Sequence, residues 1–142
     1  MNYTPRELMV VCAARQIRDG EKVFVGMRLP LLAFALAKLT HAPNCIGLFE
    51  NGLARATPAA ELLYTMGDLP NVTGALWATH TVTLLGLMAA GEVQLGFIGG
   101  AEIDRYGNLN TSAIGDWQRP TVRLPGSGGG GKIGRASCRE RV

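Results

Sequence analysis

One glutamate stands where this chain could carry out covalent chemistry. Glu50 directly follows the apolar run Cys45–Phe49 and precedes Asn51-Gly52. In open α/β sheets, ligands bind beyond the carboxyl ends of the strands, and a glycine there permits the positive φ of a tight turn. A carboxylate at that position points into a crevice, and it is ionised at neutral pH without the help of a general base. The alternative interpretation is a solvated loop glutamate.

Glycine turns at two other strand ends could stabilise the negative charge that such an attack creates. Gly26 follows the short apolar run that ends at Val25, and Gly99-Gly100 follows the run Val93–Ile98. Glycine lets a backbone N–H approach a ligand closely, which an oxyanion hole requires. We therefore name Gly26, Gly99 and Gly100 as candidates for an oxyanion or ligand-binding loop. Ordinary turn chemistry is the alternative for any one of them.

A third glycine-rich segment, Gly126–Gly131, precedes Lys132 and nearly fits the phosphate-binding pattern G-x-x-x-x-G-K-[ST]. Ile133 occupies the position that requires a hydroxyl, so the phosphate-binding interpretation is rejected. The dinucleotide pattern G-x-G-x-x-G is rejected too, because no convincing helix follows it. We interpret the segment as a loop beside a bound ligand or a flexible linker, with Gly126 and Gly128 as the candidates to contact the ligand.

The elements that must position these residues alternate between helical and strand patterns. Helices are expected over 4–18, where Thr4-Pro5-Arg6-Glu7 forms a capping box, and over 30–39 and 81–90. Strands are expected over 22–25, 45–49, 93–98, 109–114 and 121–124, while 53–77 shows only weak patterns. This alternation predicts an α/β fold with an open, mostly parallel sheet flanked by helices. The first strand–helix–strand unit implies a right-handed crossover.

Composition excludes several classes of protein. Hydrophobic residues make up 47% of the chain and charged residues 18%, as in globular domains. The apolar stretches 29–39 and 81–90 are too short to cross a bilayer, and the first residues lack the features of a secretion signal. These observations predict a cytoplasmic protein with no membrane partner. Cys12, Cys45 and Cys138 have no disulfide or metal-ligand spacing, and His41 and His80 are isolated, so no metal is expected.

The last eleven residues, Lys132–Val142, reproduce the translation of a common short-read sequencing adapter. We therefore divide the chain into native residues 1–131 and a non-native segment 132–142, and we expect the native protein to continue beyond Gly131. The net charge of +3 arises entirely from this tail, because the basic and acidic side chains of residues 1–131 balance at ten each. No basic surface remains to indicate a nucleic-acid partner.

Several ordered blocks give the chain a specific resemblance to a known family. They are Val25-Gly-Met-Arg-Leu-Pro-Leu31, Ala42-Pro-Asn44, Phe49-Glu-Asn-Gly-Leu53, Phe97-Ile-Gly-Gly-Ala-Glu-Ile-Asp104, Tyr106-Gly-Asn108, Ile114-Gly-Asp116 and Arg123-Leu-Pro-Gly-Ser-Gly-Gly129. In this order they resemble the β-type subunits of family I CoA-transferases, and the glutaconate CoA-transferase group most closely. The resemblance covers essentially all of residues 1–131, about half of a complete subunit, so it implies the CoA-transferase fold truncated on its C-terminal side.

The resemblance implies a ping-pong transfer of coenzyme A from an acyl-CoA to a free carboxylic acid, through a glutamyl-CoA thioester on Glu50. It implies an α-type partner subunit, coenzyme A as a substrate and no permanently bound cofactor. Asn51 is a candidate to contact the substrate. Arg28 stands where the family usually has a glycine, so it either pairs with a substrate carboxylate or is an exposed arginine. The fragment alone is expected to fold poorly and to be inactive, because a sheet cut midway exposes apolar surface and an edge.

Two alternative functions stay open at this point. The first is an acyl-CoA thioester hydrolase or a ring-cleaving enzyme on the same scaffold, in which water or another nucleophile intercepts the substrate. The second is a non-catalytic binding subunit. A covalent adduct between Glu50 and coenzyme A would exclude the hydrolase, and loss of turnover in Glu50→Ala would exclude the binding subunit.

Overall fold

The computed structural model of the chain describes residues 2–130 and the backbone of residues 139–141. Its centre is a six-stranded sheet with the order β10-β5-β1-β2-β3-β4. The strands of this sheet are β1 (Lys22–Phe24), β2 (Ile46–Leu48), β3 (Leu53–Arg55), β4 (Trp77–Ala78), β5 (Leu95–Phe97) and β10 (Arg139–Arg141). β1 pairs in parallel with both β2 and β5, whereas β3 and β4 are antiparallel to their neighbours. The sheet is therefore mixed, with a parallel centre.

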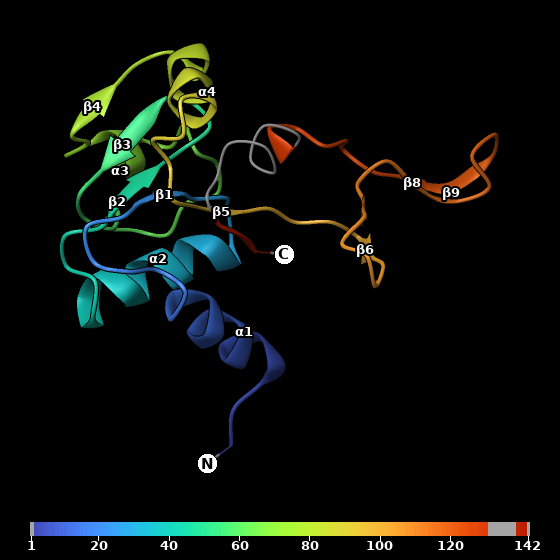
Figure 1. The fold of residues 1–142 in the computed structure, drawn as a ribbon, viewed down its shortest axis with the longest axis horizontal. Helices are drawn as coiled ribbons and strands as arrows, with labels where there is room; N and C mark the ends of the chain where they lie inside the picture. Colours follow the sequence, from blue (N-terminus) through green and yellow to red (C-terminus); the bar gives the residue numbers. More distant parts are fainter. Residues whose placement is uncertain (1, 131–138, 142) are drawn as a thin grey trace.

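Four helices accompany the sheet: α1 (Pro5–Ala14), α2 (Leu29–Thr40), α3 (Leu69–Val72) and α4 (Thr81–Ala89). Figure 1 shows α1 and α2 on one side of the sheet and α4 on the other. Two apolar clusters match these layers, because alternate residues of a strand face opposite sides. Val23 and Phe49 pack with α1 and α2, whereas Phe24 and Leu48 pack with Leu84 of α4.

The core confirms the α/β fold predicted from the sequence, and most element boundaries agree. The capping box at the start of α1 is formed, with the Glu7 amide donating to Thr4 Oγ1 at 3.2 Å and the Thr4 amide donating to Glu7 Oε2 at 2.6 Å. Gly91, at φ +76°, follows the last turn of α4 as expected. None of the helices in residues 2–130 combines the length and apolar character that a membrane span requires.

Two expected elements differ from the structure. The first helix ends at Ala14 rather than near Arg18, because the Gln16 and Ile17 amides donate to Ala13 and Ala14 three residues back and close tighter turns. The strand expected over 109–114 is split into β7 (Leu109–Asn110) and β8 (Ala113–Gly115). Asn110 Oδ1 accepts the Ser112 amide at 3.1 Å, and this side-chain turn breaks the strand.

After β5 the chain leaves the sheet as an extended arm, defined here as residues 99–125. It carries two small antiparallel ribbons, β6 (Glu102–Ile103) with β7 and β8 with β9 (Pro120–Arg123). In Figure 1 the arm runs away from the sheet, and none of its side chains is fully buried. The arm therefore depends on local hydrogen bonds rather than on a core of its own.

The backbone of Arg139–Arg141 pairs in parallel with Leu95–Phe97. The remainder of the segment assigned to the adapter, 132–138 and Val142, lies outside the described residues. An exposed strand edge accepts any extended backbone, since the bonds involve only N–H and C=O groups. The pairing therefore does not bear on the division of the chain at residue 131, which stays a prediction.

Candidate active site

Glu50 lies at the tip of the hairpin that joins β2 to β3. The Gly52 amide donates to the Phe49 carbonyl at 2.8 Å, and the Phe49 amide donates to the Leu53 carbonyl at 2.9 Å. These bonds close a three-residue turn in which Gly52 has φ +93°, the geometry in which glycine is favoured. Glu50 therefore stands beyond the carboxyl end of a parallel strand on a tightly bonded turn.

The turn has no room for any residue but glycine at position 52. A Cβ atom placed on Gly52 would lie 2.0 Å from the Thr79 carbonyl oxygen, and the Thr79 amide already donates to the Gly52 carbonyl at 2.9 Å. The residue that follows strand β4 thus packs directly against the turn. The positive φ predicted from Asn51-Gly52 is confirmed, but the close approach of Thr79 could not be read from the sequence.

The Glu50 carboxylate lies against the glycine-rich segment that follows the arm. A Cβ atom on Gly129 would be 3.3 Å from Glu50 Oε1, and one on Gly128 would be 3.6 Å from it. The side chain is half-buried, and within the described residues it takes part in no hydrogen bond or ion pair. The absence of side chains at 128 and 129 lets the backbone approach the carboxylate, and no cationic side chain among residues 2–130 pairs with it.

The other glycine candidates make no close contact with the Glu50 carboxylate. A Cβ atom on Gly26 would lie 3.6 Å from the Phe97 carbonyl oxygen, so the ends of β1 and β5 meet there. Gly99 has open space around its Cα, whereas Gly100 packs against Leu109, 2.7 Å from a Cβ atom on that glycine. Gly126 has φ +90° and its amide donates to Thr111. The structure thus brings Gly128 to Glu50, and it shows no contact of Glu50 with Gly26, Gly99, Gly100 or Gly126.

The sequence analysis missed three residues that lie against Glu50 or in the segment that contacts its hairpin. Gly129 belongs to the glycine run, but nothing singled it out from its neighbours. Arg55 was missed because arginine is usually exposed, yet the residue is only 3% exposed, and Asn71 is fully buried. Burial lowers the pKa of the Arg55 guanidinium, but arginine keeps its charge in proteins.

Arg28 borders a cavity of about 390 Å³ between α2 and residues 58–63. The lining is mainly apolar, including Leu29, Leu32 and Leu63, and Glu61 is the other charged residue beside Arg28. The cavity begins at the carboxyl end of β1, the same edge of the sheet that carries Glu50 after β2. Its size falls within the range of small-molecule sites.

Arg28 is also the only non-glycine residue in the described part of the chain with positive φ, at φ +66° and ψ −115°. Such a conformation costs about 1–3 kcal/mol for a residue with a Cβ atom. A glycine relieves that strain but loses about 0.5–1 kcal/mol of chain entropy. Glycine would adopt the backbone conformation of residue 28 without this strain.

We expect Arg28→Gly to raise the free energy of unfolding by about 0.5–2 kcal/mol in the complete protein, the difference between relieved strain and added chain entropy. Thermal unfolding measures it. Arg18→Gly is the control, since Arg18 has no positive φ, and it should lower stability by about 0.5–1 kcal/mol. A loss of stability in both variants would contradict the strain at residue 28.

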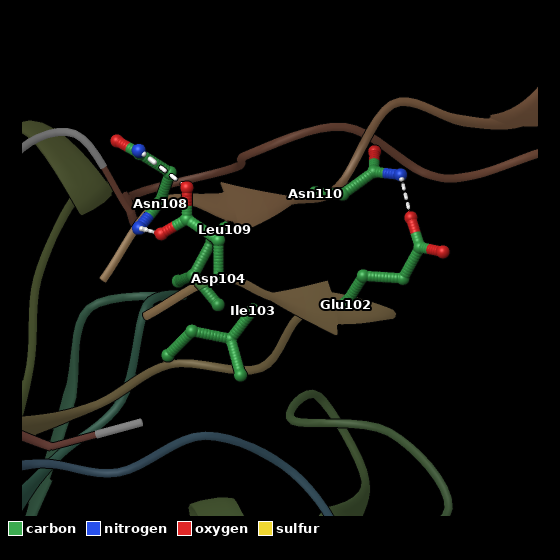
Figure 2. A pocket seen from close by; sticks show the side chains of 6 residues that line it. All are labelled: Glu102, Ile103, Asp104, Asn108, Leu109 and Asn110. Atoms are coloured by element: carbon green, nitrogen blue, oxygen red, sulfur yellow. Dashed lines mark hydrogen bonds between the residues drawn. The ribbon is translucent and has the colours of Figure 1, made fainter. Parts of the chain in front are cut away.

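A second hollow lies on the arm between β6 and β7, with a volume of about 310 Å³. Figure 2 shows its polar side chains bonded to one another. Asn110 Nδ2 donates to Glu102 at 2.6 Å, and Asn108 Nδ2 donates to Asp104 at 2.8 Å. Side-chain and backbone donors of Asn108 lower the pKa of Asp104. These carboxylates therefore tie the ribbon together.

The sequence of the whole chain settles the family. Residues 6–140 match the family model described as coenzyme A transferase. The chain belongs to the coenzyme A transferase family. Within residues 2–130 no group of three or more histidine, cysteine, aspartate or glutamate side chains is arranged to hold a metal ion.

Curated members of this family align with nearly the whole chain. It is 39% identical over 132 residues to the B subunit of 3-oxoadipate CoA-transferase from Pseudomonas knackmussii, covering 92% of this chain and 50% of the relative. It is 38% identical over 139 residues to the B subunit of glutaconate CoA-transferase from Acidaminococcus fermentans, covering 93% and 51%. The chain thus spans about half the length of the curated relatives it matches.

Solved structures of the coenzyme A transferase fold agree. Glutaconate coenzyme A-transferase from Acidaminococcus fermentans superposes with a TM-score of 0.85 at 37% identity, covering 96% of this chain and 54% of the other. The decarboxylase AibA/AibB superposes with the same TM-score at 32% identity, covering 98% and 58%. Proteins with different named activities therefore share this architecture, and the chemistry must be argued from the site.

Proposed function

We propose that this chain is part of the catalytic β-type subunit of a two-subunit CoA-transferase, with Glu50 as the nucleophile. The observation that supports this most directly is the Glu50 carboxylate itself, held on a tight turn at a strand end, half-buried and lying against Gly128 and Gly129. The named CoA-transferase relatives are B subunits, which supports an α-type partner. The cytoplasmic location predicted from the sequence stays a prediction.

The reaction begins when a Glu50 carboxylate oxygen attacks the thioester carbonyl carbon of an acyl-CoA. The carbon–sulfur bond breaks, and coenzyme A leaves as a thiolate while a mixed anhydride remains on Glu50. The thiolate then attacks the Glu50 carbonyl carbon and releases the first acid as a carboxylate. This step leaves coenzyme A on Glu50 as a thioester, and no proton has been transferred.

A second carboxylic acid reverses these steps. Its carboxylate attacks the Glu50 thioester and displaces the thiolate, which attacks the acyl carbon of the new anhydride and regenerates the Glu50 carboxylate. Each attack creates an oxyanion, and each backbone N–H aimed at such an oxygen contributes about 2.7–4 kcal/mol. We propose that Gly128, with Gly26, Gly99 and Gly100, frames this site, and that Gly126 shapes the loop. No metal or bound cofactor is required, because coenzyme A is itself a substrate.

The cavity beside Arg28 is the proposed position of the acyl group. Its leucine side chains suit an aliphatic chain, and the Arg28 guanidinium suits a carboxylate on that chain. The acyl-CoA would approach along the edge of the sheet that carries both Glu50 and the start of α2. The remote nucleotide of coenzyme A supplies binding energy that can be used at the reacting carbon.

Mass spectrometry of the assembled two-subunit enzyme tests the mechanism. Incubation with an acyl-CoA and no acceptor acid is expected to place coenzyme A on the peptide that contains Glu50, at one equivalent per site. Borohydride should reduce that thioester and inactivate the enzyme. Continuous release of free acid without an adduct would instead indicate a thioester hydrolase, and the Glu50 proposal would then be wrong.

A further inference from the structure

The residues after β3 form a segment, 56–73, whose carbonyl groups converge on one buried side chain. Arg55 donates to the carbonyls of Thr57 and Thr73 at 3.0 and 2.8 Å. It also donates to Pro58 and Pro70 at 3.3 and 3.2 Å and to Asn71. A buried cation is tolerated only when its hydrogen bonds are satisfied, and here backbone dipoles supply all five acceptors. Arg55 therefore holds both ends of the segment in place.

The middle of the same segment contacts the Glu50 turn. Asn51 Nδ2 donates to the Met66 carbonyl at 2.8 Å, and Asn51 Oδ1 accepts the Leu53 amide at 3.4 Å. Asn71 Nδ2 donates to the same Met66 carbonyl at 2.7 Å. One amide proton of Asn51 is thus used within the protein. Its neighbour in the chain is Glu50, so the contact acts directly on the turn that carries the carboxylate.

These bonds close a ring. Asn51 and Arg55 both lie on the β2–β3 hairpin, and both contact the 56–73 segment, at Met66 and at Asn71 respectively. Arg55 opposes Gly47 in the β2–β3 pairing, so the ring is anchored in the sheet. A hairpin joined to its neighbour at two separate points resists rotation of its tip more than one joined at a single point.

We propose that segment 56–73 braces the Glu50 turn and that Asn51 is the positioning residue through which it acts. The inference rests on the proposed function, because a brace matters for turnover only if Glu50 must meet a carbonyl carbon. Misplacement of a reacting group by about 1 Å can cost about 10²-fold in rate. Asn51 controls the direction of the carboxylate without touching the reacting atoms.

The test uses Asn51→Ala in the assembled two-subunit enzyme. We expect kcat and the rate of adduct formation at Glu50 to fall about 10-fold, the equivalent of one hydrogen bond of about 1.4 kcal/mol, while KM for acyl-CoA changes less than threefold. A substrate-binding role for Asn51 would instead raise KM. A rise in KM without loss of kcat, or an unchanged kcat, would overturn the proposal.

Asn44→Ala is the matched control. Asn44 Nδ2 also makes an exposed hydrogen bond, to Asp19 at 2.9 Å, but it precedes β2 at the opposite edge of the sheet. Its removal costs a similar interaction and is expected to leave kcat unchanged. An equal loss of kcat in Asn44→Ala and Asn51→Ala would reduce the effect to general destabilisation and overturn the positioning role.

Two further measurements complete the test. Hydrogen exchange of the peptide that contains the Gly52 and Leu53 amides should be faster in Asn51→Ala than in Asn44→Ala, whatever the chemistry at Glu50. If Glu50→Gln retains turnover, the proposed function fails, whereas this exchange difference still reports the brace.

Arg55→Lys should lower kcat as well. In the double variant the loss should be smaller than the two single losses combined, because both residues act through one segment. Additive effects, or unchanged exchange at the turn, would contradict the brace.

Discussion

Glu50→Gln is expected to reduce turnover of the assembled enzyme by about 10⁴–10⁶-fold, the range for removal of a covalent nucleophile. The amide has nearly the shape of the carboxylate, so the turn and its bonds to Phe49 and Leu53 should persist. It lacks the anionic oxygen that attacks the thioester. Steady-state transfer from an acyl-CoA to an acceptor acid measures the loss, and thermal unfolding confirms that the protein stays folded.

Glu92→Gln is the matched control for this substitution. Glu92 pairs with Lys22 at 2.7 Å at the amino-terminal edge of the sheet, and an exposed ion pair adds little to stability. Its activity should equal that of the unmodified enzyme. If Glu50→Gln keeps more than about a tenth of the activity, covalent catalysis by Glu50 is excluded, and the non-catalytic subunit becomes the better interpretation.

Gly52→Ala is expected to have the second largest effect. The added Cβ atom would lie 2.0 Å from the Thr79 carbonyl oxygen and 2.7 Å from its carbon, and the residue would have to keep φ +93°. Overpacking costs about 1–3 kcal/mol, and an alanine at positive φ adds about 1 kcal/mol. We therefore expect the free energy of unfolding to fall by about 2–4 kcal/mol. Activity should fall at least 100-fold, because the turn must move to relieve the contact.

Gly20→Ala separates the cost of the positive φ from the cost of the steric overlap with Thr79. Gly20 has φ +76°, but a Cβ atom on it would meet nothing within 4 Å. Its unfolding free energy should therefore fall by about 1 kcal/mol only, the cost of the backbone conformation, with full activity. Denaturant unfolding and transfer assays on both variants give the comparison. Equal effects in the two variants would show that Thr79 does not constrain the turn.

The sequence predicted the parts of this fold that depend on local periodicity. β1, α2, β2, α4 and β5 were expected within one or two residues of where they lie, because long apolar periods and caps are local signals. Glu50 was found for a related reason, since a polar residue between an apolar run and Asn-Gly marks a strand end. The relation of Glu50 to the parallel pair then followed from the general geometry of α/β sheets.

The remaining features depend on contacts that are distant in the sequence. β3 and β4 are too short to show alternation, and they pair with β2 and with each other across residues 56–76. From the sequence alone Arg55 would be assigned to the surface, whereas in the structure it donates hydrogen bonds to five carbonyl groups. Gly128 and Gly129 reach Glu50 from nearly eighty residues away. No local sequence pattern specifies these contacts between Glu50 and the glycines, because they depend on how the chain returns to the sheet after the arm.

The return of the arm has a consequence for the fate of the Glu50 thioester. Gly128 and Gly129 lie against the carboxylate, and the chain reaches them from β5 through residues 99–125, none of which is fully buried. Such a segment opens at a lower free energy than the sheet does. On the proposed mechanism, each opening admits water to an activated acyl group without disturbing the turn that holds Glu50. If Glu50 forms the proposed thioester, we expect the ratio of transfer to hydrolysis to depend on the local stability of the arm, and contacts that hold the arm in place in the assembled enzyme would protect the intermediate.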